Sequence, residues 1–213
     1  RWLAEGEVPT LGHWFRAAGY DTHYDGKWHV SHADLLIPGT HRSLMASDDD
    51  GNPRPDAIEA YEKADRLDPY GFSGWIGREP HGIPKNNTGM VRDPVFAEQV
   101  AGLFGDIERS DDERPWLAVA SFVNPHDIAF NGIGWTQILG FDHPDLGIGD
   151  IAPAPSQGDS FDGRPACQAQ FERLWHRMTF DQHADAQYRA LYYYLHEVVD
   201  LAIARILSAL DQA

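Results

Sequence analysis

Apolar positions along the chain switch between helical and extended spacing. Apolar residues three and four apart predict amphipathic helices over 10–18, 93–109 and 185–210. Residues 20–24 alternate as a short strand does, and the almost unbroken apolar run 116–123 predicts a strand buried on both faces, as in a parallel sheet. The order of helix, strand, helix, strand and helix predicts an α/β fold with a layered α/β/α sheet.

Two long stretches between these elements, 31–92 and 131–165, have the composition of loops. Loops of this length in a compact protein are more often functional than idle. Trp75 and Trp135 lie in them and are candidates to line a substrate pocket. The helix that follows the first stretch is expected to begin with Asp93 as its N-cap, because proline comes next and suits the first helical position.

Polar side chains follow each of the two expected strands. Lys27 and His29 come after an Asp-Gly turn that ends the first strand, and Asn124 and His126 follow the second. Open α/β sheets bind ligands beyond the carboxyl ends of their strands, so we expect these groups to meet at one rim. A lysine ammonium and two imidazoles there form an anion site for sulfate, phosphate or a carboxylate. The alternative is a solvated lysine beside two structural histidines.

The charge of the chain makes such a cationic pocket stand out. Lys and Arg number 17 against 33 Asp and Glu, a formal net charge of −16. Non-specific nucleic-acid binding and a polybasic membrane surface are therefore excluded. No apolar run approaches the roughly 20 residues of a membrane span. The hydrophobic fraction of 42% indicates a globular protein rather than a disordered one, and nothing in the sequence indicates a compartment.

A single cysteine, Cys167, excludes an internal disulfide framework and any site with several thiolate ligands. We interpret it as a structural or surface cysteine. Two other candidate sites are weaker. The histidines between 23 and 41 lack the spacing of a zinc site. The acidic run 48–50 lacks the full pattern of a calcium loop, and a solvated turn is the simpler interpretation.

Longer segments around the polar clusters resemble a known family. Residues 10–20, followed by Gly26-Lys27-Trp28-His29, are similar to the helix, strand and GKWH segment of the type I sulfatases, the arylsulfatase-like members of the alkaline phosphatase superfamily. Residues 115–126 resemble the second signature of that family, an apolar strand that ends in Asn-Pro-His. The helix expected over 185–210 resembles the one that follows. The resemblance covers most of the chain in the right order.

The resemblance implies a sulfuric ester hydrolase that acts on small-molecule sulfate monoesters. In the family, a formylglycine hydrate attacks sulfur beside a divalent metal, usually Ca²⁺. The resemblance implies that Lys27 neutralises charge on the transferring group. His29 would donate a hydrogen bond or a proton near the nucleophile. His126 would contact the sulfate and pass a proton to the leaving alcohol, and Asn124 is grouped with these substrate-binding residues.

Two parts of the family pattern are not found in the sequence. The nucleophile motif, C/S-x-P/A-x-R, belongs before the GKWH segment, and the residues before Lys27 do not show it. The segment that starts at Cys167 has Phe171 where the motif needs Arg. A later metal-binding pair and a second lysine belong after the long helix. We therefore expect residues 1–213 to be a partial sulfatase domain, inactive alone, with the ligands of Ca²⁺ and the formylglycine elsewhere.

Two other functions stay open at this stage. A phosphonate or phosphate monoester hydrolase of the same superfamily would use a similar pocket, because sulfate and phosphate both present tetrahedral oxygens. A non-catalytic, truncated chain that only binds oxyanions is the third hypothesis. In that case exposed sheet edges predict self-association or low stability.

Overall fold

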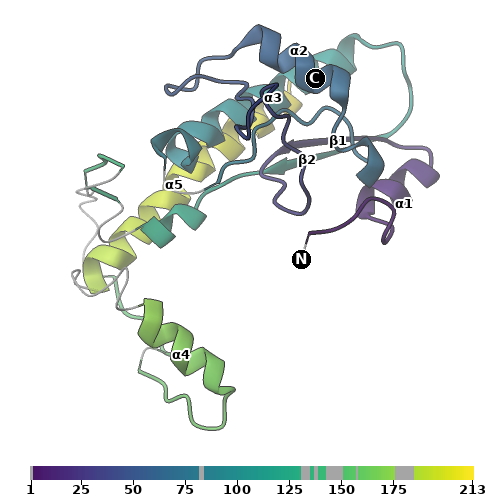
Figure 1. The fold of residues 1–213 in the computed structure, drawn as a ribbon. Coiled ribbons are helices and arrows are strands. Elements are labelled where there is room, and N and C mark those ends of the chain that lie inside the picture. Colours follow the sequence, from purple (N-terminus) through teal and green to yellow (C-terminus); the bar gives the residue numbers. More distant parts are fainter. Residues whose placement is uncertain are drawn as a thin grey trace.

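The computed structural model describes residues 2–81, 84–130, 135–136, 139–142, 151–156, 158–175 and 185–213. In the described residues, helices precede and follow each of the two strands along the chain (Figure 1). In order, the helices and strands are α1 (Leu11–Ala17), β1 (Asp21–Gly26), α2 (Pro55–Ala64), α3 (Gly89–Arg109), β2 (Trp116–Ser121), α4 (Ala166–Trp175) and α5 (Asp185–Leu210), with short 3₁₀ helices at η1 (Asp68–Tyr70), η2 (Lys85–Asn87) and η3 (His126–Phe130).

The two strands form a parallel pair, which confirms the α/β class and the parallel sheet expected from the sequence. The register places Asp21 opposite Trp116 and Gly26 opposite Ser121. The expected Asp-Gly turn is instead the last part of β1, and the chain leaves the strand at Gly26 with φ of 99°. Both strands therefore end at the same edge of the sheet.

The strand β2 is less buried than its sequence suggests. Its residues are half-buried and Ala120 is exposed, whereas the apolar run predicts burial on both faces. Among the described residues, β1 is the only strand that pairs with β2, and α3 is the helix in extensive contact with it. Within the described ranges, the second face and the second edge of β2 therefore lack the cover that a buried parallel strand has.

The helix α3 begins earlier than expected. Thr88 is its N-cap, and Asp93, the expected cap, lies in the second turn with 0% of its surface exposed. Pro94 consequently lies inside the helix. The carboxylate of Asp93 does not cap its own helix, because it accepts N–H groups from the segment that follows β2. A long-range contact of this kind leaves no trace in local sequence pattern.

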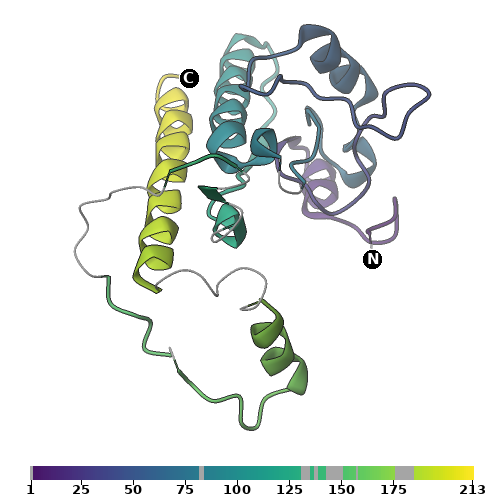
Figure 2. The ribbon, with the colours of Figure 1, turned by 60° about the vertical axis from the view of Figure 1, so that its left-hand side comes forward.

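The helix α5 has the expected bounds and packs along α3, with which it shares its main helix–helix contact (Figure 2). Its buried stripe consists of Leu191, Leu195, Val199 and Ala202. An exposed ion pair also joins the two helices, since the guanidinium of Arg205 lies 2.7 Å from a carboxylate oxygen of Glu98. The first half of α5 closes a small second core with Trp135 and Leu139.

The main core comes largely from the loop-rich stretch 31–92. Nine buried residues form it: Trp28, Ala33, Ala46, Ala57, Tyr61, Leu67, Tyr70, Phe72 and Trp75. The hypothesis that Trp75 and Trp135 line a substrate pocket is therefore wrong, because both are buried core residues. A loop-rich segment with many aromatic residues has here folded onto the sheet and supplied the apolar surface that regular elements usually provide.

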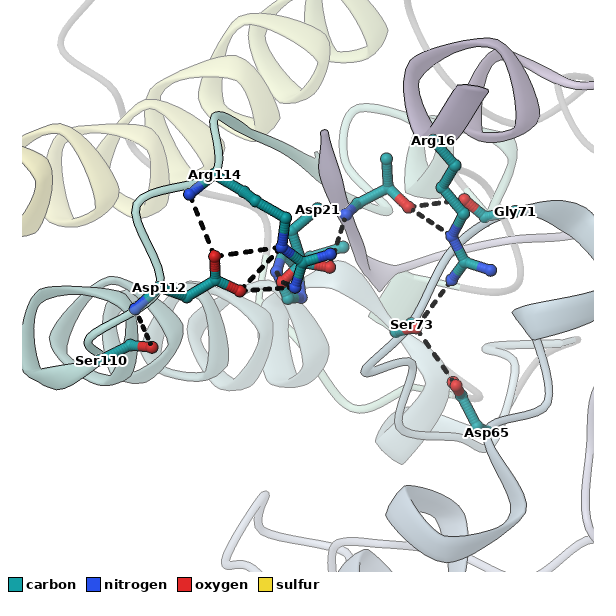
Figure 3. A network of polar contacts seen from close by, with 10 residues as sticks. Arg16, Asp21, Asp65, Gly71, Ser73, Ser110, Asp112 and Arg114 are labelled. Carbon is teal, nitrogen blue, oxygen red and sulfur yellow. Dashed lines mark hydrogen bonds and ion pairs between the residues drawn. The ribbon is translucent and has the colours of Figure 1, made fainter. Parts of the chain in front are cut away.

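A polar network holds the beginning of the two strands (Figure 3). This is the end of the sheet opposite to the one that Lys27 and His126 follow. Arg16 at the end of α1 donates to the hydroxyl of Thr22 and to that of Ser73, over 2.9 and 2.8 Å. Thr10 caps α1. The apolar face predicted for this helix is not buried, since Leu11 and Trp14 are exposed. Polar contacts rather than an apolar stripe hold α1 in place.

The helix α4 lies apart from the other helices in both views (Figures 1 and 2). It carries Cys167, which is exposed as expected of a surface cysteine. Parts of the loop expected over 131–165 lie outside the described residues. None of the helices in the described part of the chain is both long and apolar enough to span a membrane.

Candidate functional site

Lys27 lies directly after β1, and its backbone N–H still pairs with the neighbouring strand. The N–H of Lys27 donates to the carbonyl oxygen of Ser121 over 2.8 Å, and the carbonyl oxygen of Lys27 accepts the hydroxyl of Tyr24 over 2.8 Å. The next residue, Trp28, is buried in the main core and donates its indole N–H to Ser31. Sheet pairing and the buried indole therefore anchor Lys27 at the end of the strand.

His29 is exposed and has a backbone conformation that is rare for a residue with a side chain. Its φ is 47°, in the left-handed region that favours glycine. Buried Glu79 holds the turn, because its carboxylate accepts the N–H of Trp28 over 2.9 Å. Burial raises the pKa of Glu79, and the N–H groups of His29 and Trp28 partly offset this rise. Strain of this kind is common where a side chain must be presented to a ligand.

The second polar segment follows β2. Asp93 on α3 accepts the N–H of Val123 over 2.7 Å and that of Asn124 over 3.0 Å. The N–H of His126 then donates to the carbonyl oxygen of Val123 over 2.9 Å, which turns the chain into η3. His126 is exposed, whereas Asn124 is buried. The amide of the Asn124 side chain has no hydrogen-bond partner among the described residues.

The two segments lie within electrostatic reach of each other. Partial desolvation of its ring lowers the pKa of His29, and the Lys27 ammonium lowers it further. The pKa of His126 is lowered first by partial desolvation of its ring, then by Lys27 and by His29. Both imidazoles are consequently neutral at pH 7, so that each can donate one hydrogen bond and accept another. Lys27 supplies the positive charge for an oxyanion.

The structure adds neighbours that sequence reasoning missed. The ring centroid of His81 lies 4.6 Å from that of His29, edge to face, and the ring of Trp2 lies 5.4 Å from His29. Burial and the His29 ring lower the pKa of His81. His81 comes from an irregular segment more than fifty positions along the chain, so neither periodicity nor spacing could have linked it to His29.

Asp127 was also missed, although it follows His126 directly. It has 0% of its surface exposed, and its carboxylate accepts the N–H of Gly89 over 2.6 Å. Burial raises its pKa to about 7, and Asp93 contributes to the rise. The only available signal was an acidic residue directly after the Asn-Pro-His segment.

Two surface cavities flank Trp2 on the His29 side of the molecule. One has a volume of about 580 Å³ and is lined by His29 and Val30 together with the N-terminal residues. The other, of about 480 Å³, is lined by residues that include Asp34, Glu79 and His81. Both have room for a small organic group.

The described residues do not assemble a metal centre. No group of three or more His, Cys, Asp and Glu side chains in the described ranges could hold a metal ion. The calcium implied by the resemblance therefore finds no ligand set in this part of the chain. Cys167 lies on the exposed surface of α4.

Comparison with known proteins agrees with the order of elements and motifs. The model of the Sulfatase family matches residues 2–213, which is nearly the whole chain. Comparison with curated proteins finds no match. The parallel strand pair with its covering helices fits a partial alkaline-phosphatase-like domain. The chain therefore belongs to the Sulfatase family.

Proposed function

We propose that this chain supplies the oxyanion-binding part of a sulfuric ester hydrolase that acts on small-molecule sulfate monoesters. The observation that carries the proposal is the position of Lys27, His29 and His126 after two paired parallel strands, with each imidazole in the electrostatic field of Lys27. This is a local cationic site in a chain of net charge −16. A site of this kind fits a small tetrahedral anion better than an extended polyanion.

Each of the three side chains has a distinct role in this proposal. The ammonium of Lys27 offsets charge on the equatorial oxygens of the transferring group, as cationic clamps do in phosphoryl transfer. His29 donates a hydrogen bond near the site of attack. His126 passes a proton to the leaving alcohol, and its lowered pKa makes the protonated form, which is the minor form at pH 7, a stronger acid for that step.

The rest of the chemistry would come from groups that the described residues do not hold. In this family a divalent metal and a formylglycine nucleophile activate the sulfate ester. The donor set described above does not fit the metal, so the roles of Lys27, His29 and His126 are limited here to anion binding, orientation and proton transfer.

The leaving alcohol would lie against Trp2 and His81. Both rings contact the ring of His29, and the adjoining cavity is also lined by Asp34 and Glu79. Aromatic surface favours an aryl or cyclic alcohol. The two carboxylates disfavour an alcohol that bears a second anionic group.

The test compares three 4-nitrophenyl esters, the sulfate, the phosphate and the phenylphosphonate, with the full-length protein. We expect the highest kcat/KM for the sulfate, and a decrease of about 100-fold or more when Lys27 is changed to Ala. Lys63→Ala, on the exposed face of α2, is the matched control and should leave turnover unchanged. Higher turnover of the phosphate or phosphonate would identify the sister activity. Unchanged sulfate turnover in the Lys27 variant would reject the role of Lys27.

A further inference from the structure

Two buried carboxylates connect α3 and the His126 segment in opposite directions. Asp93 extends from α3 and accepts the N–H groups of Val123 and Asn124, which precede His126. Asp127 directly follows His126 and accepts the N–H of Gly89, the first residue of α3. The backbone on both sides of His126 is therefore tied to one helix.

The packing around this connection leaves little freedom. Asp93 and Asp127 are fully buried, and Asn124 is nearly so. A Cβ atom at Gly89 would lie 2.5 Å from both the Asn124 amide nitrogen and a carboxylate oxygen of Asp93. The two carboxylates and the amide are consequently packed against the helix backbone, where glycine alone leaves enough room. His126 itself stays exposed above this buried layer.

A buried carboxylate is costly, so two of them in one place need a reason. The N–H at the first position of α3 has no partner within the helix, and a negative charge there is favourable. Asp127 satisfies that requirement. Asp93 has no such role, since the hydrogen bonds of its carboxylate among the described residues are those to the N–H groups of Val123 and Asn124. Burial of the Asp93 carboxylate therefore has no role in capping the helix, and its effect is to fix the backbone that precedes His126.

From this geometry we propose that Asp93 and Asp127 are positioning residues, which together hold the backbone of His126 so that its ring is presented at the ends of the two strands. The effect on turnover rests on the function proposed above. The connection itself does not, because it can be measured in the protein without any substrate.

The electrostatic surroundings give the connection a spectroscopic signature. Burial raises the pKa of Asp93 to about 6 and that of Asp127 to about 7, and Lys27 acts against both rises. Arg92 also faces Asp93, and the two carboxylates face each other. An N–H that donates to a carboxylate shifts when the carboxylate ionises. The Gly89 amide should therefore report on Asp127, and the Val123 and Asn124 amides on Asp93.

The first measurement is a pH titration of the backbone amides by NMR. In the wild type, the Gly89 amide proton should shift with pH across the neutral range. In Asp127→Asn this transition should disappear, whereas the shifts of Val123 and Asn124 should remain. Asp112→Asn, at the opposite end of β2 and exposed, should change neither. A Gly89 amide that does not titrate in the wild type, or that still titrates in Asp127→Asn, would overturn the connection.

The second measurement separates positioning from stability. Asp127→Asn keeps an acceptor oxygen for Gly89, and Asp127→Ala does not. In the full-length protein, we expect Asp127→Ala to lower kcat for the sulfate ester at least tenfold with little change in KM, and Asp127→Asn to restore most of it. A lowered thermal midpoint with unchanged kcat would reduce Asp127 to a stabilising residue and reject the proposal. A wild type without sulfate turnover would contradict the proposed function, while the amide titration would still decide the connection.

Discussion

The indole N–H of Trp75 donates to the carbonyl oxygen of Gly26 over 2.8 Å. Trp75 is a core residue with 1% of its surface exposed, and Gly26 is the last residue of β1. The next residue along the chain is Lys27. The position of the candidate anion-binding lysine is therefore coupled directly to the packing of the main core.

Changing Trp75 to Phe should lower the free energy of unfolding by about 1–3 kcal/mol. The phenyl ring keeps much of the apolar contact but leaves the buried carbonyl oxygen of Gly26 without its donor. Urea denaturation measures the change in the free energy of unfolding, provided that its dependence on urea concentration is the same in the variant and the wild type. The same substitution at Trp14, which is 62% exposed, is the control and should cost less than about 0.5 kcal/mol. Equal effects at the two positions would mean that the hydrogen bond to Gly26 contributes nothing.

The parts of the site that the sequence predicts are those with a local signal. Short strands followed by polar residues place Lys27, His29, Asn124 and His126, and the parallel pairing of the strands brings the two segments to one edge. Apolar spacing predicts the bounds of α5 well, because a long stripe of apolar residues at helical spacing fits few other bounds. These features depend on residues within a few positions of one another.

The parts that the sequence does not predict depend on contacts across the chain. His81 packs against His29, and Glu79 holds the same turn, yet both come from an irregular segment with no periodicity. Asp93 has the local appearance of a helix cap. Asp93 instead lies inside α3, where its carboxylate accepts an N–H group from the segment after β2. Local propensity was overridden at this position by a tertiary hydrogen bond.

Changing Lys27 to Met should raise the pKa of His29 and of His126. The Lys27 ammonium disfavours the protonated imidazole in both residues, so its removal makes protonation easier. A pH titration of the imidazole Cε1–H signals by NMR measures both values. Lys63→Met, on the exposed end of α2, should shift neither. Unchanged titration of His29 and His126 would show that the two histidines do not share a site with Lys27.

Asp25 should make the protein less stable as the pH rises towards neutrality. Burial raises its folded pKa to about 7, above the ordinary value of 3.8. Between these values the folded state keeps a proton that the unfolded state releases, so the free energy of unfolding falls with rising pH, by up to about 1.4 kcal/mol per pH unit. Asp25→Asn removes this contribution.

Urea denaturation of the wild type and of Asp25→Asn at pH 5 and pH 8 tests this expectation. The stability of the variant relative to the wild type should increase between the two pH values. Asp56→Asn, at an exposed position in the first turn of α2, should keep the wild-type dependence. A parallel pH dependence in Asp25→Asn and the wild type would mean that Asp25 ionises normally in the folded protein.

Two glycines of α3 should respond to alanine in opposite directions. At Gly89, the added Cβ would lie 2.5 Å from the Asn124 amide nitrogen and from a carboxylate oxygen of Asp93. Both of those side chains are buried and cannot move aside, so Gly89→Ala should cost about 1–3 kcal/mol through overpacking. At Gly102, nothing lies within 4 Å of the added Cβ, so Gly102→Ala should stabilise the helix by up to about 1 kcal/mol. Thermal and urea denaturation of the two variants measure both effects. Stabilisation by alanine at Gly89 would show that the layer of Asp93, Asn124 and Asp127 is looser than described, and it would weaken the case that this layer positions His126.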